Sequence, residues 1–193
     1  MEITNLQQYK NYLDSYYSSS QYFYDIDDAL DGAYTALDNG LKNLPTGKKP
    51  AVCLDIDETM ISEYDLMKAN DYGFPYDWLL IAWQKTDFPA LEAVLDFYDY
   101  CLVNKVYIFV ISSRTTNYQD TVSLLLENAG YTNTSNIYLK NENDKRTTEQ
   151  FKTDTRLKLI ASGYDILVNI GDQVGDLNGA ADYQCKLPNP FYE

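Results

Sequence analysis

The chain has 193 residues, enough for one domain with its own core, and its 45% hydrophobic and 23% charged residues are typical of a globular protein. A formal net charge of −14 argues against nucleic-acid polymers and anionic membranes as partners, because both require a basic surface. The sequence contains no histidine, which excludes Ser-His-Asp triads, histidine nucleophiles and histidine-ligated zinc, so any chemistry must use carboxylates, hydroxyls, lysine or a hard metal ion.

The first expected element is helical and covers residues 5–44. Apolar and tyrosine side chains recur there every three or four residues, as at Tyr9, Leu13 and Tyr16, which is the period of one helix face. The chain does not open with a basic stretch followed by an apolar one, so we expect no export signal. No apolar run reaches the ~20 residues that a membrane-spanning helix requires.

Four later runs are continuously apolar, which is typical of strands buried on both faces of a sheet. Strands that alternate with helices predict an α/β fold with a mainly parallel central sheet covered on both faces. The last residues, 186–191, include two prolines and are expected to form an extended tail. We expect strands at 50–54, 106–111, 137–139 and 166–170, connected by helices at 90–102, 120–129 and 149–162.

An irregular, aromatic-rich segment, residues 61–89, interrupts this alternation and is expected to form a small helical cap inserted after the first strand. Its rings, among them Tyr64, Tyr76, Trp78 and Trp83, could stack on the base or sugar of a substrate, or they could fill the core of the cap itself. We therefore expect a single domain over residues 1–193, with an N-terminal helical segment at 1–47 and the cap at 61–89.

Two aspartates directly follow the first expected strand, in the stretch Leu54-Asp55-Ile56-Asp57-Glu58-Thr59. Residues two apart in an extended segment face the same side, so the Asp55 and Asp57 carboxylates emerge together, near the Thr59 hydroxyl. One carboxylate could attack an electrophile while the other donates and later removes a proton. By itself, an acidic pair after a strand is more often only a polar turn.

Polar residues also follow two other expected strands. Ser112 and Ser113 come directly after the second strand, where hydroxyls and free backbone amides either hold phosphate oxygens or cap the next helix. Asp172 and Asp176 follow the fourth strand. Since ligands collect at the carboxyl ends of parallel strands, these acidic groups are expected near the first pair, where their repulsion requires a cation.

All-oxygen ligation of that cation favours Mg²⁺ over zinc. Lys152 could bring a further positive charge to the same cleft, or it could be an ordinary surface lysine. Each signal is moderate alone, but the order and placement of the three strand-end groups strengthen the combination.

These motifs together resemble those of the haloacid-dehalogenase-like (HAD) superfamily, and within it the class B and class C acid phosphatases (subfamily IIIB) and the plant vegetative storage proteins. The resemblance covers nearly the whole chain and implies a Rossmann-like three-layer α/β/α sandwich and a hydrolase that cleaves phosphomonoesters. The residues that match are 54–59 for the first motif, 110–114 for the second, Lys152 for the third, 169–173 with Asp176 for the fourth, and the tail at 186–191.

The resemblance implies catalytic and metal-binding roles. Asp55 is the nucleophile that forms an aspartyl-phosphate, and Asp57 is the general acid and base. Mg²⁺ is the cofactor, held by the Asp55 and Asp172 carboxylates and by the Asp57 backbone carbonyl. Thr59 and Asp176 support this site from outside the metal shell.

The resemblance also implies that Ser112, Ser113 and Lys152 bind the phosphate. Lys140 and Lys145 lie near enough in the sequence to compete with Lys152 for this role. The expected substrate is a small phosphomonoester, such as a nucleoside monophosphate or an aryl phosphate. Relatives of this kind imply a secreted or periplasmic location, although no signal peptide is visible, and a cytoplasmic location is the alternative.

Two other functions fit the same motifs. One is a storage or binding protein that keeps the fold with little turnover, and the other is a phosphotransferase or phosphomutase of the same superfamily. The intact pair of Asp55 and Asp57 favours a hydrolytic enzyme.

Overall fold

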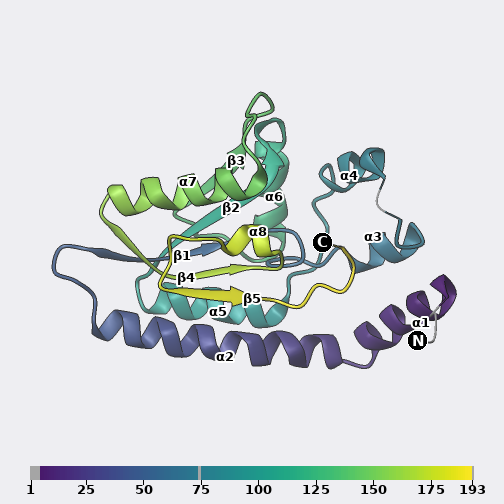
Figure 1. Ribbon diagram of the computed structural model, residues 1–193, viewed down its shortest axis with the longest axis horizontal. Helices are drawn as coiled ribbons and strands as arrows, with labels where there is room; N and C mark the ends of the chain where they lie inside the picture. Colours follow the sequence, from purple (N-terminus) through teal and green to yellow (C-terminus); the bar gives the residue numbers. More distant parts are fainter. Residues whose placement is uncertain (1–4, 74, 193) are drawn as a thin grey trace.

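The computed structural model describes residues 5–73 and 75–192, which form a central sheet with helices on both faces (Figure 1). The strand order across the sheet is β3-β2-β1-β4-β5, and every neighbouring pair is parallel. The predicted α/β fold with a mainly parallel sheet is therefore confirmed. The strands are β1 (Lys49–Leu54), β2 (Tyr107–Thr115), β3 (Asn136–Lys140), β4 (Tyr164–Gly171) and β5 (Tyr183–Lys186).

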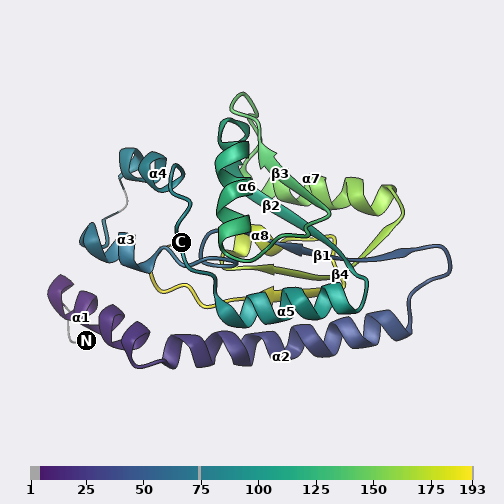
Figure 2. The ribbon, with the colours of Figure 1, turned by 180° about the vertical axis from the view of Figure 1, so that it is seen from behind.

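Helices cover both faces of this sheet. On one face lie the long α2 (Gln21–Lys42) and α5 (Glu92–Val103), with α6 (Gln119–Asn128) contributing to the same core. On the other face lies α7 (Thr148–Ala161), next to the short α8 (Val174–Leu177) (Figures 1 and 2).

Strand β1 is buried from both sides because its side chains alternate between the two faces. Val52 and Leu54 belong to the core under α2 and α5, whereas Ala51 and Cys53 belong to the core under α7. This double burial explains why the strand is continuously apolar and lacks the polar alternation of a half-exposed strand.

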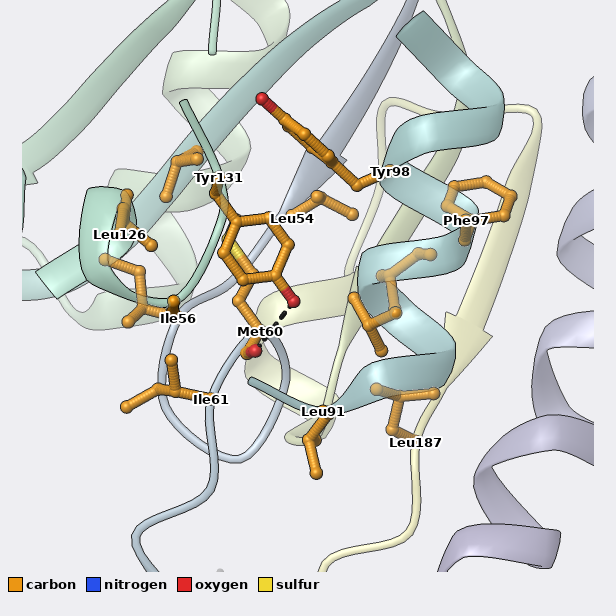
Figure 3. Packing of buried hydrophobic residues seen from close by; sticks show 14 of the residues in the cluster. Leu54, Ile56, Met60, Ile61, Leu91, Phe97, Tyr98, Leu126, Tyr131 and Leu187 are labelled. Atoms are coloured by element: carbon orange, nitrogen blue, oxygen red, sulfur yellow. Dashed lines mark hydrogen bonds between the residues drawn. The ribbon is translucent and has the colours of Figure 1, made fainter. Parts of the chain in front are cut away.

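The larger core extends into the loop that follows β1. Ile56 and Met60 are buried in the same cluster as Leu126 and Tyr131 (Figure 3). The Tyr131 hydroxyl donates a hydrogen bond to the Met60 carbonyl at 2.8 Å, which satisfies a buried backbone acceptor. This loop is thus held by packing and by a hydrogen bond from a distant part of the chain.

The helical stretch predicted at residues 5–44 is divided into two helices, α1 (Leu6–Ser18) and α2. The division lies at Ser20, whose φ of 65° is in the left-handed region. Because of this break α1 projects beyond the sheet and lies beside α3 (Tyr64–Ala69) (Figure 1). The helical period continues on both sides of the break, so it does not reveal the change in direction.

Between β1 and α5 the chain forms α3 and α4 (Tyr76–Ala82), two short helices that stand beyond one end of the sheet (Figures 1 and 2). Within residues 5–73 and 75–192, no helix has the length and apolar character needed to cross a bilayer.

The sequence patterns predicted neither β5 nor α8. The strand reads Tyr-Gln-Cys-Lys and lies at the edge of the sheet, where its partly exposed positions accept polar residues. The helix has four residues, which is too short to show a period. After β5, residues 187–192 form a tail that runs toward α3 and the N-terminal helix (Figure 1).

Candidate active site

The carboxyl ends of neighbouring strands bring the expected acidic residues together. Asp55 follows β1 and Asp172 follows β4, and these strands pair with Leu54 in register with Ile170. The Asp55 amide continues this pairing by donating to the Ile170 carbonyl at 3.0 Å. Two side chains far apart in the sequence therefore leave the same edge of the sheet side by side.

Three buried aspartates form a carboxylate cluster. Asp55, Asp172 and Asp176 each offer an oxygen that lies within 4.8 Å of those of the other two. Burial, reinforced by the neighbouring carboxylates, raises the pKa of both Asp55 and Asp172. Because the donors are all carboxylate oxygens and carry more negative charge than one lysine offsets, the cluster fits a hard divalent cation.

Lys152 reaches this cluster from α7. Its Nζ lies 2.6 Å from Asp55 Oδ1 and 2.6 Å from Asp176 Oδ1. Burial alone would lower the pKa of Lys152, but the two carboxylates outweigh burial and raise it. The lysine therefore stays charged between the two aspartates and offsets part of their repulsion.

The two competing lysines lie elsewhere. The Lys140 ammonium donates to the Arg146 carbonyl in the loop before α7, and Lys145 is exposed in that loop. Among the three lysines considered from the sequence, Lys152 is the one that the structure brings to Asp55.

Asp176 owes its position to neighbouring groups whose roles the sequence analysis did not identify. A Cβ at Gly171 would come within 2.5 Å of the Asp176 Cβ, so this close approach requires glycine. The Asp176 carbonyl accepts hydrogen bonds from Arg156 Nη1 at 2.7 Å and from Asn169 Nδ2 at 2.9 Å. Arg156 is buried, which nothing in its helical sequence context indicates.

Asp57 is held by a buried arginine. Arg114 Nε lies 3.1 Å from Asp57 Oδ1 and 3.2 Å from Oδ2, and Arg114 Nη2 lies 2.5 Å from Oδ1. The same Nη2 donates to Glu63 Oε1 at 3.2 Å. Burial, with the Asp57 charge adding to it, raises the pKa of Glu63. A planar guanidinium that donates hydrogen bonds to both oxygens fixes the carboxylate orientation more strictly than an ammonium would.

The remaining expected site residues have distinct surroundings. Ser112 is fully buried in β2, and its Oγ accepts the Arg114 amide at 3.2 Å. Ser113 instead lines a cavity above the cluster. Thr59 Oγ1 donates to Asp172 Oδ1 at 3.3 Å, so it contacts the carboxylate cluster directly.

The cavity above these residues has a volume of about 390 Å³, enough for a small ester. Asp55, Asp57 and Lys152 line it from the sheet edge. Leu79 and Trp83, from α4 and its C-terminal end, form part of its wall. A larger hollow of about 630 Å³, between α2 and α5, contains none of the expected site residues.

Of the aromatic residues expected at the substrate, Trp83 lines the cavity, whereas Tyr64 and Trp78 do not. Tyr64 is buried and stacks on Tyr17, with ring centroids 3.6 Å apart, and it does not line the cavity. Trp78 is also buried and does not line the cavity, whereas its neighbour in α4, Leu79, does. Tyr76 begins α4, and its side chain lies outside the described part of the structure.

Comparison with known proteins places this geometry in context. The family model described as HAD superfamily, subfamily IIIB (Acid phosphatase), matches residues 2–193. The class C acid phosphatase from Bacillus anthracis with tungstate bound superimposes with a TM-score of 0.76 at 24% identity, covering 95% of this chain and 84% of that chain. At this identity the likeness shows the shared fold.

Curated plant proteins are also similar. The Stem 28 kDa glycoprotein of Glycine max is 32% identical over 163 residues, covering 78% of this chain and 63% of the relative. Acid phosphatase 1 of Solanum lycopersicum is 29% identical over 144 residues, covering 72% and 56% respectively. Vegetative storage protein 1 of Arabidopsis thaliana is 29% identical over 197 residues, covering 95% and 69%. The chain thus spans less than two thirds of the Glycine max and Solanum lycopersicum relatives.

Proposed function

Since the chain belongs to subfamily IIIB of the HAD superfamily, the acid phosphatases, we propose that it hydrolyses phosphomonoesters through an aspartyl-phosphate on Asp55, with Mg²⁺ as cofactor. One observation carries the proposal. The Asp55 carboxylate lies at the floor of a cavity, in contact with Lys152 and clustered with Asp172 and Asp176. The proposed nucleophile Asp55, the Lys152 ammonium and the proposed cation site thus lie together at one cavity.

The residues that would hold Mg²⁺ are Asp55 and Asp172 through their carboxylates and Asp57 through its backbone carbonyl. When bound there, Mg²⁺ would neutralise charge on the phosphoryl group and on the aspartates. The fit is supported by the buried, all-oxygen cluster and by its excess of negative charge.

Hydrolysis takes place in two steps on the chain's own residues. In the first step, an Asp55 oxygen attacks phosphorus and the bond from phosphorus to the ester oxygen breaks, while Asp57 protonates the departing alkoxide. In the second step, Asp57 removes a proton from a water molecule that attacks the aspartyl-phosphate, releasing phosphate and regenerating Asp55. The hydrogen bonds from Arg114 to Asp57 support the proton-transfer role, because they orient the Asp57 carboxylate toward the cavity.

Charge on the transferring phosphoryl group would be stabilised by Lys152, whose Nζ already contacts the nucleophile. The Ser112 and Ser113 hydroxyls and neighbouring backbone amides at the end of β2 would bind the phosphate oxygens. Of these two serines, Ser113 is the one that lines the cavity.

The cavity admits a small phosphomonoester, and an aryl phosphate or a nucleoside monophosphate is the proposed substrate class. Leu79 and Trp83 provide apolar wall for the leaving group, so Trp83 is the proposed aromatic contact among the rings of the cap. Three relatives of Glycine max are named stem glycoproteins, which supports a location outside the cytoplasm.

The test is a phosphate-release screen over aryl phosphates, nucleoside monophosphates and sugar phosphates, with Mg²⁺ and with chelator. We expect release with Mg²⁺ and its reversible loss with chelator. Robust phosphate release in the presence of chelator would contradict the assignment of Mg²⁺ as cofactor. An added alcohol that captures the phosphoryl group would identify a phosphotransferase instead.

A storage protein with little turnover is the second candidate, because two relatives of Arabidopsis thaliana are named vegetative storage proteins. Absence of release for every ester in the screen, from a folded protein that binds Mg²⁺, would favour that candidate. The retained cluster around Asp55 favours the enzyme.

A further inference from the structure

The tail after β5 returns to the catalytic edge of the sheet. It leaves β5 through Leu187, whose amide donates to the Gly171 carbonyl at 3.0 Å, directly before the cluster residue Asp172. Five residues later Tyr192 lines the cavity. The tail therefore forms one wall of the site described above.

One tail residue contacts the carboxylate cluster. Asn189 Nδ2 donates to Asp172 Oδ2 at 2.7 Å, and Gln173 Nε2 donates to the same oxygen at 2.7 Å. Asp172 Oδ1 accepts a longer hydrogen bond, of 3.3 Å, from the Thr59 hydroxyl. Because Oδ2 already accepts two short hydrogen bonds, Oδ1 is the oxygen that Asp172 can offer to a cation.

The tail is itself fixed at both sides of Asn189. Asn189 Oδ1 accepts the Phe191 amide at 2.8 Å, which closes a turn. The Phe191 ring lies among three tyrosine rings from α2 and the α3 region, with centroid distances of 6.0 Å to Tyr22, 5.8 Å to Tyr64 and 6.3 Å to Tyr72.

Two more hydrogen bonds complete this attachment. The Tyr9 hydroxyl of α1 donates to the Pro190 carbonyl at 3.1 Å. Gln173 Nε2, which already contacts Asp172, also donates to the Tyr192 carbonyl at 3.2 Å. The tail is thus bound at one side to the N-terminal helices and at the other to Gln173 and the cluster residue Asp172.

We propose that the C-terminal tail is a structural part of the metal site, with Asn189 as a positioning residue that orients Asp172 toward the cation and Phe191 as the anchor that holds Asn189 in place. This inference rests on the proposed function for the identity of the cation. Hydrogen-bond partners of metal-binding carboxylates typically change metal affinity ~10–100-fold when they are removed.

The experiment measures Mg²⁺ binding by titration calorimetry on the full chain without substrate, for wild type, Asn189→Ala, Phe191→Ala and Asn117→Ala. Asn117 is a matched control, because its amide donates to Glu142, an exposed carboxylate outside the cluster. We expect Asn189→Ala to weaken Mg²⁺ binding ~10–100-fold. Phe191→Ala should weaken it in the same direction, and Asn117→Ala should leave it unchanged.

A second readout separates positioning from general stability. The unfolding temperature in chelator reports the metal-free fold, and turnover at saturating Mg²⁺ reports the loaded site. A positioning role predicts that the unfolding temperature of Asn189→Ala in chelator stays near that of wild type and that saturating Mg²⁺ restores its turnover.

An unchanged Mg²⁺ dissociation constant for Asn189→Ala would overturn the proposal, as would a loss of unfolding temperature that accounts for the weaker binding. A wild type that binds Mg²⁺ but hydrolyses no ester would contradict the proposed function alone, because the binding comparison still stands. A wild type that binds no Mg²⁺ would overturn both.

Discussion

Asp55 and Asp57 lie two residues apart, yet each contacts a different positively charged side chain. Asp55 contacts the ammonium of Lys152 at 2.6 Å, whereas both oxygens of Asp57 accept hydrogen bonds from the Arg114 guanidinium. An ammonium is a compact charge, and that of Lys152 lies beside Asp55 where it can offset charge on a transferred phosphoryl group, while a planar guanidinium fixes the orientation of its partner. The two surroundings suit a nucleophile at Asp55 and an oriented proton carrier at Asp57.

The proposed proton-transfer role of Asp57 predicts a loss of turnover that depends on the leaving group. Asp57→Asn keeps the size of the side chain but cannot exchange a proton, so turnover of an alkyl phosphate should fall ~10²–10⁴-fold. Turnover of p-nitrophenyl phosphate should fall less in its first step, because its leaving group needs no proton. Single-turnover rates for both substrates provide the measurement.

Asp154→Asn is the matched control, because Asp154 pairs with Arg146 on the surface and does not line the cavity. It should leave both rates unchanged. Equal losses for the alkyl and aryl substrates in Asp57→Asn would contradict the assignment of Asp57 as the acid.

Sequence reasoning found the residues at strand ends and missed the buried charges around them. Asp55 and Asp172 were predicted together because apolar runs precede both and because parallel strands end at one edge of the sheet. Glu63 and Arg114 are 51 residues apart, one in the expected cap and the other at the end of the second motif. Their burial follows from three-dimensional pairing, which no local pattern contains.

At the scale of elements, the strands and long helices follow from patterns that local burial imposes. Double burial gives β1 and β4 their apolar runs, and helices with one buried face repeat every three or four residues. Neither pattern predicts the edge strand β5 or the four-residue α8, although α8 carries Asp176. The direction of α1 depends on one left-handed residue, Ser20, which no period reveals.

The short α8 is held against the end of β4 by a glycine, which predicts a specific sensitivity. In Gly171→Ala the new methyl would meet Asp176 Cβ at 2.5 Å, so α8 must shift away from the cluster. Overpacking of this kind costs ~1–3 kcal/mol, and the shift should also reduce turnover. Chemical denaturation and the specificity constant for an aryl phosphate measure the two effects.

Gly175→Ala is the comparison, because the nearest atom to its new methyl is Glu149 Cβ at 3.8 Å. It lies within α8, where alanine is a better helix former, so its free energy of unfolding should stay the same or rise slightly. Equal stability of the Gly171→Ala and Gly175→Ala variants would show that the close approach at Gly171 is not required.

At the scale of the whole molecule, the N-terminal helices, the loop after β1 and the tail share one buried network. The Tyr22 hydroxyl of α2 donates to Glu58 Oε2 at 3.0 Å, and the Glu63 amide donates to Glu58 Oε1 at 2.6 Å. Tyr22 also contacts the tail through Phe191, with ring centroids 6.0 Å apart. Segments from both ends of the chain thus support the loop that carries the proposed nucleophile.

This network predicts a pH dependence of stability. Burial raises the pKa of Glu58 to about 8 from 4.5, despite the two hydrogen bonds that favour its ionised form. As pH rises between these values, the unfolded chain releases this proton while the folded chain keeps it, so the free energy of unfolding should fall. Denaturation in chelator across this pH range measures the fall.

Glu58→Gln removes the titration. It keeps one acceptor oxygen for the Glu63 amide, and its NH2 group can donate to the Tyr22 hydroxyl, so it should flatten this part of the pH profile. Glu127→Gln, an exposed glutamate on α6, should leave the profile as in wild type. A Glu58→Gln profile parallel to that of wild type would exclude Glu58 as the source.

The most direct test of the central claim is to trap the covalent intermediate. The enzyme is mixed with Mg²⁺ and an aryl phosphate, quenched in acid and treated with borohydride, which reduces an aspartyl-phosphate to homoserine, and its peptides are then sequenced by mass spectrometry. We predict homoserine at position 55, dependent on both substrate and Mg²⁺. Turnover without any modification of Asp55, or homoserine at Asp57 or Asp172 instead, would contradict the account.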